Sequence, residues 1–170
     1  MTITNEQLQA MIDREEILGQ IRSYARSVDR LDQALGKAVF HPDARADYGK
    51  MFQGTGWGFI DWCLDSHLSL LSHSHQFSNI SIVIDGDHAR SETYGDVTVR
   101  WRDGQAVTHV MRNLGRYIDR WEKRDGSWRI SDRKYVHDMD YGGPVATTDM
   151  YAMTGRRDRM DASYFPEAGA

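Results

Sequence analysis

The sequence has little of what marks several large classes of protein. Its 170 residues include one cysteine, Cys63, so no disulfide can form within the chain. Cys63 stands beside Trp62 and Leu64 in a helical pattern, which favours a thiol packed in the core over a nucleophile. No stretch approaches the roughly 20 apolar residues of a membrane span, and the first residues lack a basic region followed by an apolar run. We therefore expect a cytoplasmic protein without a membrane segment.

The chain also lacks an excess of positive charge. It carries 21 basic and 25 acidic residues, a net charge of −4 and a pI near 5.9. This balance predicts no nucleic-acid partner and no anionic membrane partner. The dense basic cluster at 156–159 is more typical of a solvated tail or a subunit contact. With no internal repeat and 40% hydrophobic residues, the length fits one globular domain.

Helical spacing dominates the first part of the chain. Thr4, with Gln7 three residues later, fits an N-cap, and apolar residues then recur at helical intervals as far as Val28. This predicts a long first helix, with a break near Arg14 left open. We expect next a short helix over 31–40 that ends before Pro42, a short strand over 44–48, a glycine-rich loop over 49–58, and a third helix from 55 or 56 to 71.

The second half of the chain alternates between apolar and polar residues. Alternation predicts four strands, over 77–84, 89–101, 107–121 and 128–139. An Asp-Gly pair recurs in each of the intervening segments, at 85–86, 103–104 and 125–126, and this pair is a strong hairpin signal. Helices followed by a long antiparallel meander indicate an α+β fold, with the helices packed on one face of a curved sheet.

Two histidines, His73 and His75, stand where the helical pattern gives way to alternation, and side chains there can point into a cavity. Asp29, at the end of the first helix, is the carboxylate available to them if the sheet curls back over the helix. The helix macrodipole disfavours a carboxylate at that end, so Asp29 needs a partner. A histidine paired with a carboxylate can act as an acid or base. The alternative is an exposed loop aspartate held by Arg26 or Arg30.

A metal site is the competing interpretation of the same histidines. His73 and His75 would face the same way on an extended segment, as paired metal ligands can. Two ligands do not make a metal site, however, and the sequence does not place His109 or His137 near them. We therefore predict no metal and interpret His73 as a supporting residue. The remaining histidines, His41, His67 and His88, are interpreted as structural or exposed.

Four short motifs carry a family resemblance: Tyr24-x4-Asp29, Ala46-Asp47-Tyr48, His75-Gln-Phe-Ser-Asn-Ile80 and Arg124-Asp-Gly-Ser-Trp-Arg-Ile-Ser-Asp-Arg133. In this order they resemble the NTF2-like superfamily, specifically its SnoaL-like branch. That branch contains scytalone dehydratase, hexachlorocyclohexane dehydrochlorinase and bile-acid 7α-dehydratase. The resemblance covers residues 5 to 140. We accordingly divide the chain into a SnoaL/NTF2-like domain over 1–141 and a C-terminal tail over 142–170 that covers the pocket or contacts another subunit.

The resemblance implies a cone, in which the N-terminal helices pack on a strongly curved mixed or antiparallel sheet and enclose a pocket. It further implies a His-Asp dyad formed by His75 and Asp29, no cofactor, and a homo-oligomer, with a trimer favoured. Tyr24 and Tyr48 match positions of polar pocket residues in relatives. Arg133 matches an arginine on the last strand, where it would neutralise an oxyanion or pair with Asp132 or Asp138.

Aromatic residues are the other candidates for the site. Besides Tyr24 and Tyr48, the substrate-binding candidates are Trp57, Phe59, His73, Trp101 and Tyr117. For each aromatic residue the alternative role is ordinary core or sheet packing. Together they would suit a flat aromatic or polycyclic small molecule.

These features lead to a specific functional hypothesis. We expect a cofactor-independent lyase that eliminates water from a hydroxylated aromatic or polycyclic compound. The same groups could release formaldehyde from a phenolic diol such as a lignin-derived diarylpropane diol. The alternatives are an isomerase or cyclase acting on an enolisable ketone, and a noncatalytic binding protein resembling a dioxygenase β subunit. The last alternative predicts no contact between His75 and Asp29.

Overall fold

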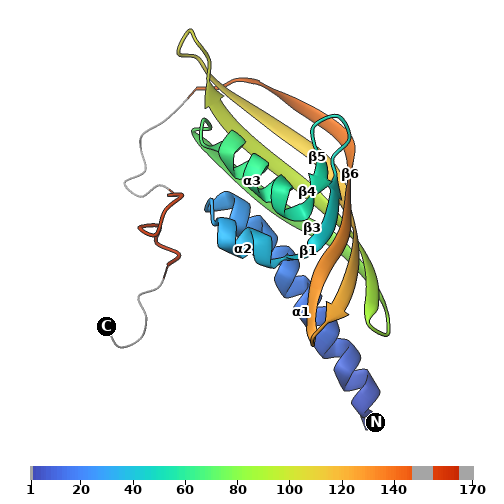
Figure 1. The fold of residues 1–170 in the computed structure, drawn as a ribbon. Helices are drawn as coiled ribbons and strands as arrows, with labels where there is room; N and C mark the ends of the chain where they lie inside the picture. Colours follow the sequence, from blue (N-terminus) through green and yellow to red (C-terminus); the bar gives the residue numbers. More distant parts are fainter. Residues whose placement is uncertain (1, 147–154, 165–170) are drawn as a thin grey trace.

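Three helices cover one face of a six-stranded sheet in the computed structural model, which describes residues 2–146 and 155–164 (Figure 1). The strand order is β2-β1-β6-β5-β4-β3, and the sheet is mixed and does not close into a barrel. The predicted α+β fold is confirmed. The elements are α1 (Asn5–Asp29), α2 (Gln33–Ala38), β1 (Phe40–Asp47), β2 (Gln53–Thr55), α3 (Gly56–His67), β3 (Ser72–Asp85), β4 (His88–Arg102), β5 (Thr108–Arg124) and β6 (Ser127–Pro144).

Helix α1 begins at the predicted cap and runs without a break to Asp29. The Thr4 hydroxyl accepts a hydrogen bond from the Gln7 backbone N–H, and the Gln7 side chain accepts one from the Thr4 N–H, which completes a capping box. Ile17, Ile21 and Val28 form a buried stripe at helical spacing. That stripe fixes which face of α1 packs on the sheet, and so directs Tyr24 inward.

The segment after α1 differs from the expected order of elements. The second helix ends at Ala38 instead of residue 40, because Phe40 and His41 already belong to strand β1. Strand β1 pairs in parallel with β6, and Ile130 donates its backbone N–H to the Val39 carbonyl at the start of this pairing. Strand β2 lies inside the expected loop. It has three residues, all exposed, so no alternation marked it in the sequence.

The remaining strands form the predicted meander and are longer than expected. Asp125 (φ 51°) and Gly126 (φ 77°) both have positive φ, as a two-residue type I′ hairpin turn requires. Strand β3 begins at Ser72, so His73 and His75 lie within the sheet, opposite Val99 and Val97 of β4. Both histidines therefore point to the same face of the sheet.

Glycines opposite one another shape the concave face. Gly95 of β4 pairs with Gly115 of β5. A Cβ atom on Gly95 would lie 2.6 Å from Cε2 of Tyr117, so only glycine leaves room for this ring to lie across the strands. Register shifts between β3 and β4 and between β5 and β6 add to the bend of the sheet. The curvature opens space between the sheet and α3.

The centre of the molecule contains an ion pair between Arg133 of β6 and Asp119 of β5. Arg133 Nε and Nη2 donate to the two Asp119 carboxylate oxygens at 2.7 and 2.8 Å, and each residue is 1% exposed. A charge at this depth requires a partner, because an uncompensated buried charge is strongly destabilising. The apolar core surrounds the pair, with Phe40, Trp121 and Ile130 among its fully buried members.

The described part of the C-terminal segment, 155–164, lies against the C-terminal ends of two helices. Arg157 donates to the carbonyls of His67 and Leu70 at 2.7 and 2.8 Å, and Arg30 pairs with Asp161. Strand β6 extends to Pro144, past the expected domain limit at residue 141. A role for the tail as pocket lid or subunit contact stays a prediction, and its residues 147–154 and 165–170 lie outside the described residues. Within 2–146 and 155–164, no helix combines the length and apolar character of a membrane span.

We expect Asp119→Ala to lower the free energy of unfolding by about 3–5 kcal/mol, because it leaves the buried Arg133 guanidinium unpaired. Glu15→Ala is the matched control, since it breaks an exposed ion pair with Arg22 and should cost less than about 1 kcal/mol. Urea unfolding of the two variants and the parent provides the comparison. Equal stabilities for the two variants would contradict a structural role for the buried pair.

Candidate functional site

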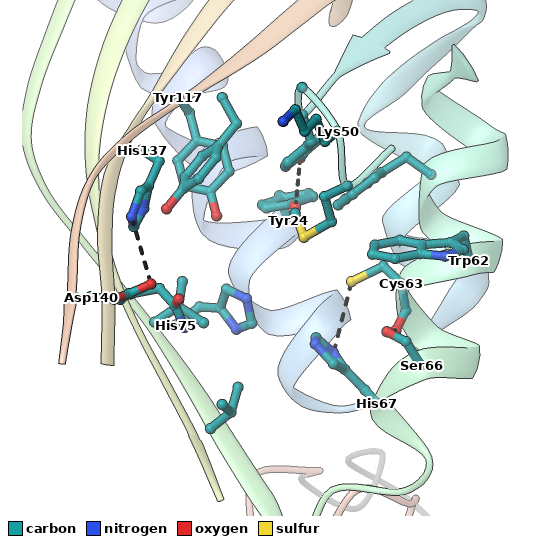
Figure 2. A pocket seen from close by; sticks show the side chains of 18 residues that line it. Tyr24, Lys50, Trp62, Cys63, Ser66, His67, His75, Tyr117, His137 and Asp140 are labelled. Carbon is teal, nitrogen blue, oxygen red and sulfur yellow. Dashed lines mark hydrogen bonds and ion pairs between the residues drawn. The ribbon is translucent and has the colours of Figure 1, made fainter. Parts of the chain in front are cut away.

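A cavity of about 670 Å³ lies between α3 and the concave face of the sheet (Figure 2). This volume falls within the range of small-molecule sites. The lining comes from α1, α3, strands β3 to β6 and the segment after β1. Its aromatic members are Tyr24, Tyr48, Phe59, Trp62, Tyr117 and Tyr135, and its histidines are His67, His75 and His137. The lining therefore combines aromatic rings with polar or charged side chains, which beside the histidines are Lys50, Ser66, Asn113 and Asp140.

His75 and Asp29 form a close pair at one side of this cavity. The Asp29 carboxylate accepts the His75 ring Nδ1–H at 2.8 Å, and both of its oxygens accept the His75 backbone N–H at 3.1 Å. The His75 side chain is 5% exposed and that of Asp29 is 18% exposed. These hydrogen bonds offset the unfavourable position of a carboxylate at the end of α1.

The contact with Asp29 determines the tautomer of the His75 ring. A carboxylate only accepts hydrogen bonds, so Nδ1 carries the proton and Nε2 of the neutral ring carries a lone pair. Because His75 also lines the cavity, Nε2 is the nitrogen available to a bound molecule. The pair thus has the arrangement of an oriented general base.

Two phenols, Tyr24 and Tyr48, meet beside the dyad. Their oxygens are 3.1 Å apart, and the Tyr48 ring stacks on Phe59 with 3.8 Å between ring centroids. Burial raises the pKa of Tyr24 and of Tyr48 well above the usual value for a phenol. Both therefore stay protonated at neutral pH. One O–H is used in the contact between the two rings, so the pair has one O–H to donate to a ligand oxygen, and neither phenol can serve as a base.

Arg133 lies behind the phenols instead of in the cavity wall. Its guanidinium carbon is 4.1 Å from the Tyr24 ring centroid and 4.8 Å from that of Tyr117. Its ion-pair partner is Asp119, and not Asp132 or Asp138 as the sequence suggested. Burial alone would lower the pKa of Arg133, but Asp119 holds this pKa well above its ordinary value. The residue is thus a permanent cation behind the tyrosine rings.

The structure brings together some of the substrate-binding candidates and separates others. Phe59 and Tyr117 line the cavity. Trp57 is 38% exposed and donates its ring N–H to the Lys37 carbonyl, and Trp101 stacks on His109 near the β4–β5 turn, so neither is part of the lining. The ring of His73 lies behind the cavity, where Nε2 donates to the Val28 carbonyl at 2.9 Å.

Several residues of the lining were missed by the sequence analysis. His67 was interpreted as structural or exposed, yet it lines the cavity. Cys63 is the core thiol that the sequence predicted, and it also lines the cavity. Phe59, Cys63 and His67 recur every four residues on α3, and this spacing places them on one helix face. That spacing was the available signal for His67. Tyr135 and His137 come from β6, and only the bend of the sheet brings them to the cavity.

The described ranges 2–146 and 155–164 contain no group of three or more histidine, cysteine, aspartate or glutamate side chains arranged to hold a metal ion. The nearest arrangement is the set of rings from His67, His73 and His75. Their centroids are 4.6, 6.0 and 6.1 Å apart, and two of the rings use a nitrogen in a hydrogen bond with Val28 or Asp29.

Solved structures share this fold at low sequence identity. A Kribbella flavida protein, Kfla4162, has a TM-score of 0.70 and 17% identity over 78% of this chain and 95% of its own. A proposed scytalone dehydratase of Novosphingobium aromaticivorans has a TM-score of 0.67 and 20% identity over 86% of this chain and 93% of its own. Hexachlorocyclohexane dehydrochlorinase LinA-type3 of Novosphingobium barchaimii has a TM-score of 0.68 and 17% identity over 83% of this chain and 95% of its own. These likenesses establish the fold and not the reaction.

No curated protein sequence matches the chain. The family comparison gives a match over most of its length, since the SnoaL-like domain aligns with residues 9–134. The aligned range contains the His75–Asp29 pair, both phenols of the cavity and Arg133. The chain belongs to the SnoaL-like domain family.

Proposed function

We propose that this protein is a cofactor-independent lyase that eliminates water from a hydroxylated aromatic or polycyclic small molecule. The observation that carries the proposal is the 2.8 Å contact between His75 Nδ1 and Asp29, in a cavity that His75 also lines. A β-elimination requires a base, and an oriented imidazole can serve as one. The dehydratase and dehydrochlorinase with the same fold support elimination as the reaction type.

The proposed reaction needs no second reactant. His75 Nε2 removes a proton from the carbon next to the one that carries the hydroxyl group. The electron pair of that C–H bond forms the new double bond, and the C–O bond breaks with its electrons going to oxygen. The protonated His75 then returns the proton to the departing oxygen, which leaves as water. Asp29 stabilises the imidazolium while it exists.

The phenols support this assignment of roles. Because burial keeps Tyr24 and Tyr48 protonated and one O–H is used in the contact between them, the other O–H of the pair can donate to a substrate oxygen as negative charge develops on it. A para-phenolic diol would fit the same site. Loss of its phenolic proton and its benzylic hydroxide, together one water, would give a quinone methide. Loss of the proton of the second hydroxyl would then break the adjacent C–C bond and release formaldehyde, with the electron pair of that bond forming the new double bond and restoring the aromatic phenol, which regains a proton. The aromatic lining and the cavity volume favour a flat substrate of this kind.

Two other functions use parts of the same site. An isomerase or cyclase would employ the dyad but would give a product of unchanged mass. A noncatalytic role like that of a dioxygenase β subunit predicts no contact between His75 and Asp29, whereas the two residues share three hydrogen bonds. We therefore favour an enzyme, and product mass separates a lyase from an isomerase.

We expect the purified protein, without added cofactor and with a chelator present, to turn over at least one member of a panel of phenolic diols, hydroxynaphthalenones and hydroxysteroids. Mass spectrometry should show loss of 18 mass units for water, or of a carbon unit. His75→Ala should reduce kcat by roughly 10²–10⁴-fold, since it removes the general base.

His109→Ala is the matched control for this experiment. His109 also pairs with an aspartate, Asp103, at 2.8 Å, but this pair lies on the β4–β5 hairpin outside the cavity lining. The control should keep the parent rate. Equal rates for His75→Ala and the parent protein, or a product of unchanged mass, would count against the lyase proposal.

We also expect Asp29→Asn to reduce kcat by roughly 10²–10⁴-fold while the protein stays folded, because an amide no longer enforces the Nδ1–H tautomer. The Asn side-chain oxygen can still accept the His75 backbone N–H, so the contact between α1 and β3 persists. Circular dichroism and urea unfolding verify the fold, and steady-state kinetics give kcat. A folded Asp29→Asn protein with the parent kcat would show that Asp29 does not act through His75.

A further inference from the structure

His67, on the last turn of α3, faces the same cavity from the side opposite His75 (Figure 2). Their ring centroids are 6.0 Å apart. This separation leaves the two rings close enough to contact one small ligand group between them. The dyad mechanism as described above does not use His67, although its ring is the second imidazole beside the base.

Cys63 determines which nitrogen of His67 carries the proton. Its Sγ lies 3.8 Å from His67 Nδ1, one helical turn earlier on α3. Burial raises the pKa of the Cys63 thiol to about 12, so the S–H proton is retained. Sulfur is a weak acceptor and an imidazole nitrogen a good one, so the favourable arrangement is S–H donating to Nδ1. The His67 proton is then on Nε2, which has no hydrogen-bond partner among the residues that the structure describes.

The surroundings keep His67 neutral. Burial, together with the nearby His73, His75 and Arg157 and against the opposing effect of Asp29, lowers the pKa of His67 to about 3. The negative end of a helix dipole would otherwise favour a protonated histidine in this last turn. Arg157 counters that field, because its guanidinium donates to the His67 and Leu70 carbonyls at this end of α3.

The two histidines therefore present complementary nitrogens to the cavity. His75 Nε2 carries a lone pair because its Nδ1–H is bound to Asp29. His67 Nε2 carries a proton because its Nδ1 accepts from Cys63. A neutral imidazole can polarise or hydrogen-bond a substrate oxygen without adding a second cation next to the imidazolium that forms on His75.

We propose that His67 is a second catalytic residue that acts as a neutral hydrogen-bond donor. Its Nε2–H binds the substrate oxygen on which negative charge develops while His75 takes the proton. Cys63 is the positioning residue that fixes the tautomer of the His67 ring. The inference rests on the proposed elimination. No proton leaves His67 in this role: its N–H bond stays intact, and the proton that moves is the one carried by His75.

The first test is the protonation state of His67, which needs no turnover. Long-range ¹H–¹⁵N spectra of the parent protein, assigned with His67→Gln, should show a neutral ring protonated on Nε2 at every pH from about 5 to 9. Cys63→Val removes the donor to Nδ1 and should give a mixture of the two neutral tautomers, whereas Cys63→Ser should restore the Nε2–H form. A His67 that titrates in this range, or that carries its proton on Nδ1 in the parent protein, overturns the proposal.

The second test is kinetic and uses the substrate identified with the parent enzyme. His67→Phe keeps a planar ring but has no donor, and its kcat should fall by roughly 10²-fold. His67→Gln places an amide N–H near the position of Nε2–H and should recover part of the rate. The acid limb of the pH profile should keep its position in His67→Gln, because a His67 that stays neutral contributes no ionisation to it. A folded His67→Phe enzyme with the parent kcat overturns the role of His67 but leaves the lyase proposal intact.

Failure of the lyase proposal has a different signature. In that case neither the parent protein nor His75→Ala turns over the panel, and binding of a panel phenol or ketone becomes the measurement. Weaker binding by His67→Phe, with recovery in His67→Gln, would retain the donor assignment as a binding role and remove the catalytic one. Equal binding by the parent protein, His67→Phe and His67→Gln would overturn both the catalytic role and the binding role of His67.

Discussion

The contact between the end of α1 and strand β3 is the interaction on which the site depends. A carboxylate at the C-terminal end of a helix is electrostatically unfavourable, and Asp29 becomes tolerable there because a backbone N–H and a ring N–H of one residue both bind it. The two residues in this contact are 46 positions apart in the sequence, so the contact also fixes how the end of α1 lies against strand β3. The hydrogen bonds that hold α1 against β3 are therefore also the ones that orient the His75 ring.

The cavity wall combines apolar burial with fixed protonation states. Burial raises the pKa of the Tyr24, Tyr48 and Tyr117 phenols, and it lowers the pKa of His67. Each of these groups is thereby kept neutral. Among the imidazoles of this lining, His75 has the buried partner Asp29, whereas His137 lies 3.7 Å from Asp140 and both of those side chains are about half exposed. The buried neutral groups around His75 can therefore act through hydrogen bonds that need no change of charge.

The sequence was informative where a feature is local and limited where it depends on curvature. The cap of α1, the Asp-Gly hairpins and the α+β order follow from short patterns, and the structure confirms them. The His75–Asp29 pair was predicted from a family motif, and the structure places the two residues in contact. The positions of Trp101 and Tyr135 could not be predicted, because which end of a strand meets the helices depends on how far the sheet bends. Assembly of several copies of the chain stays a prediction.

The pairing of β1 with β6 has a consequence for biosynthesis. These strands run in parallel and are far apart in sequence, while the other long strands pair with their neighbours along the chain. On the ribosome, β1 cannot join the sheet until the last strand has emerged. Tyr48 and α3, which follow β1, can be held in place over the cavity only after that step. The aromatic wall would thus be assembled late in synthesis, and until then its rings would be accessible to chaperones.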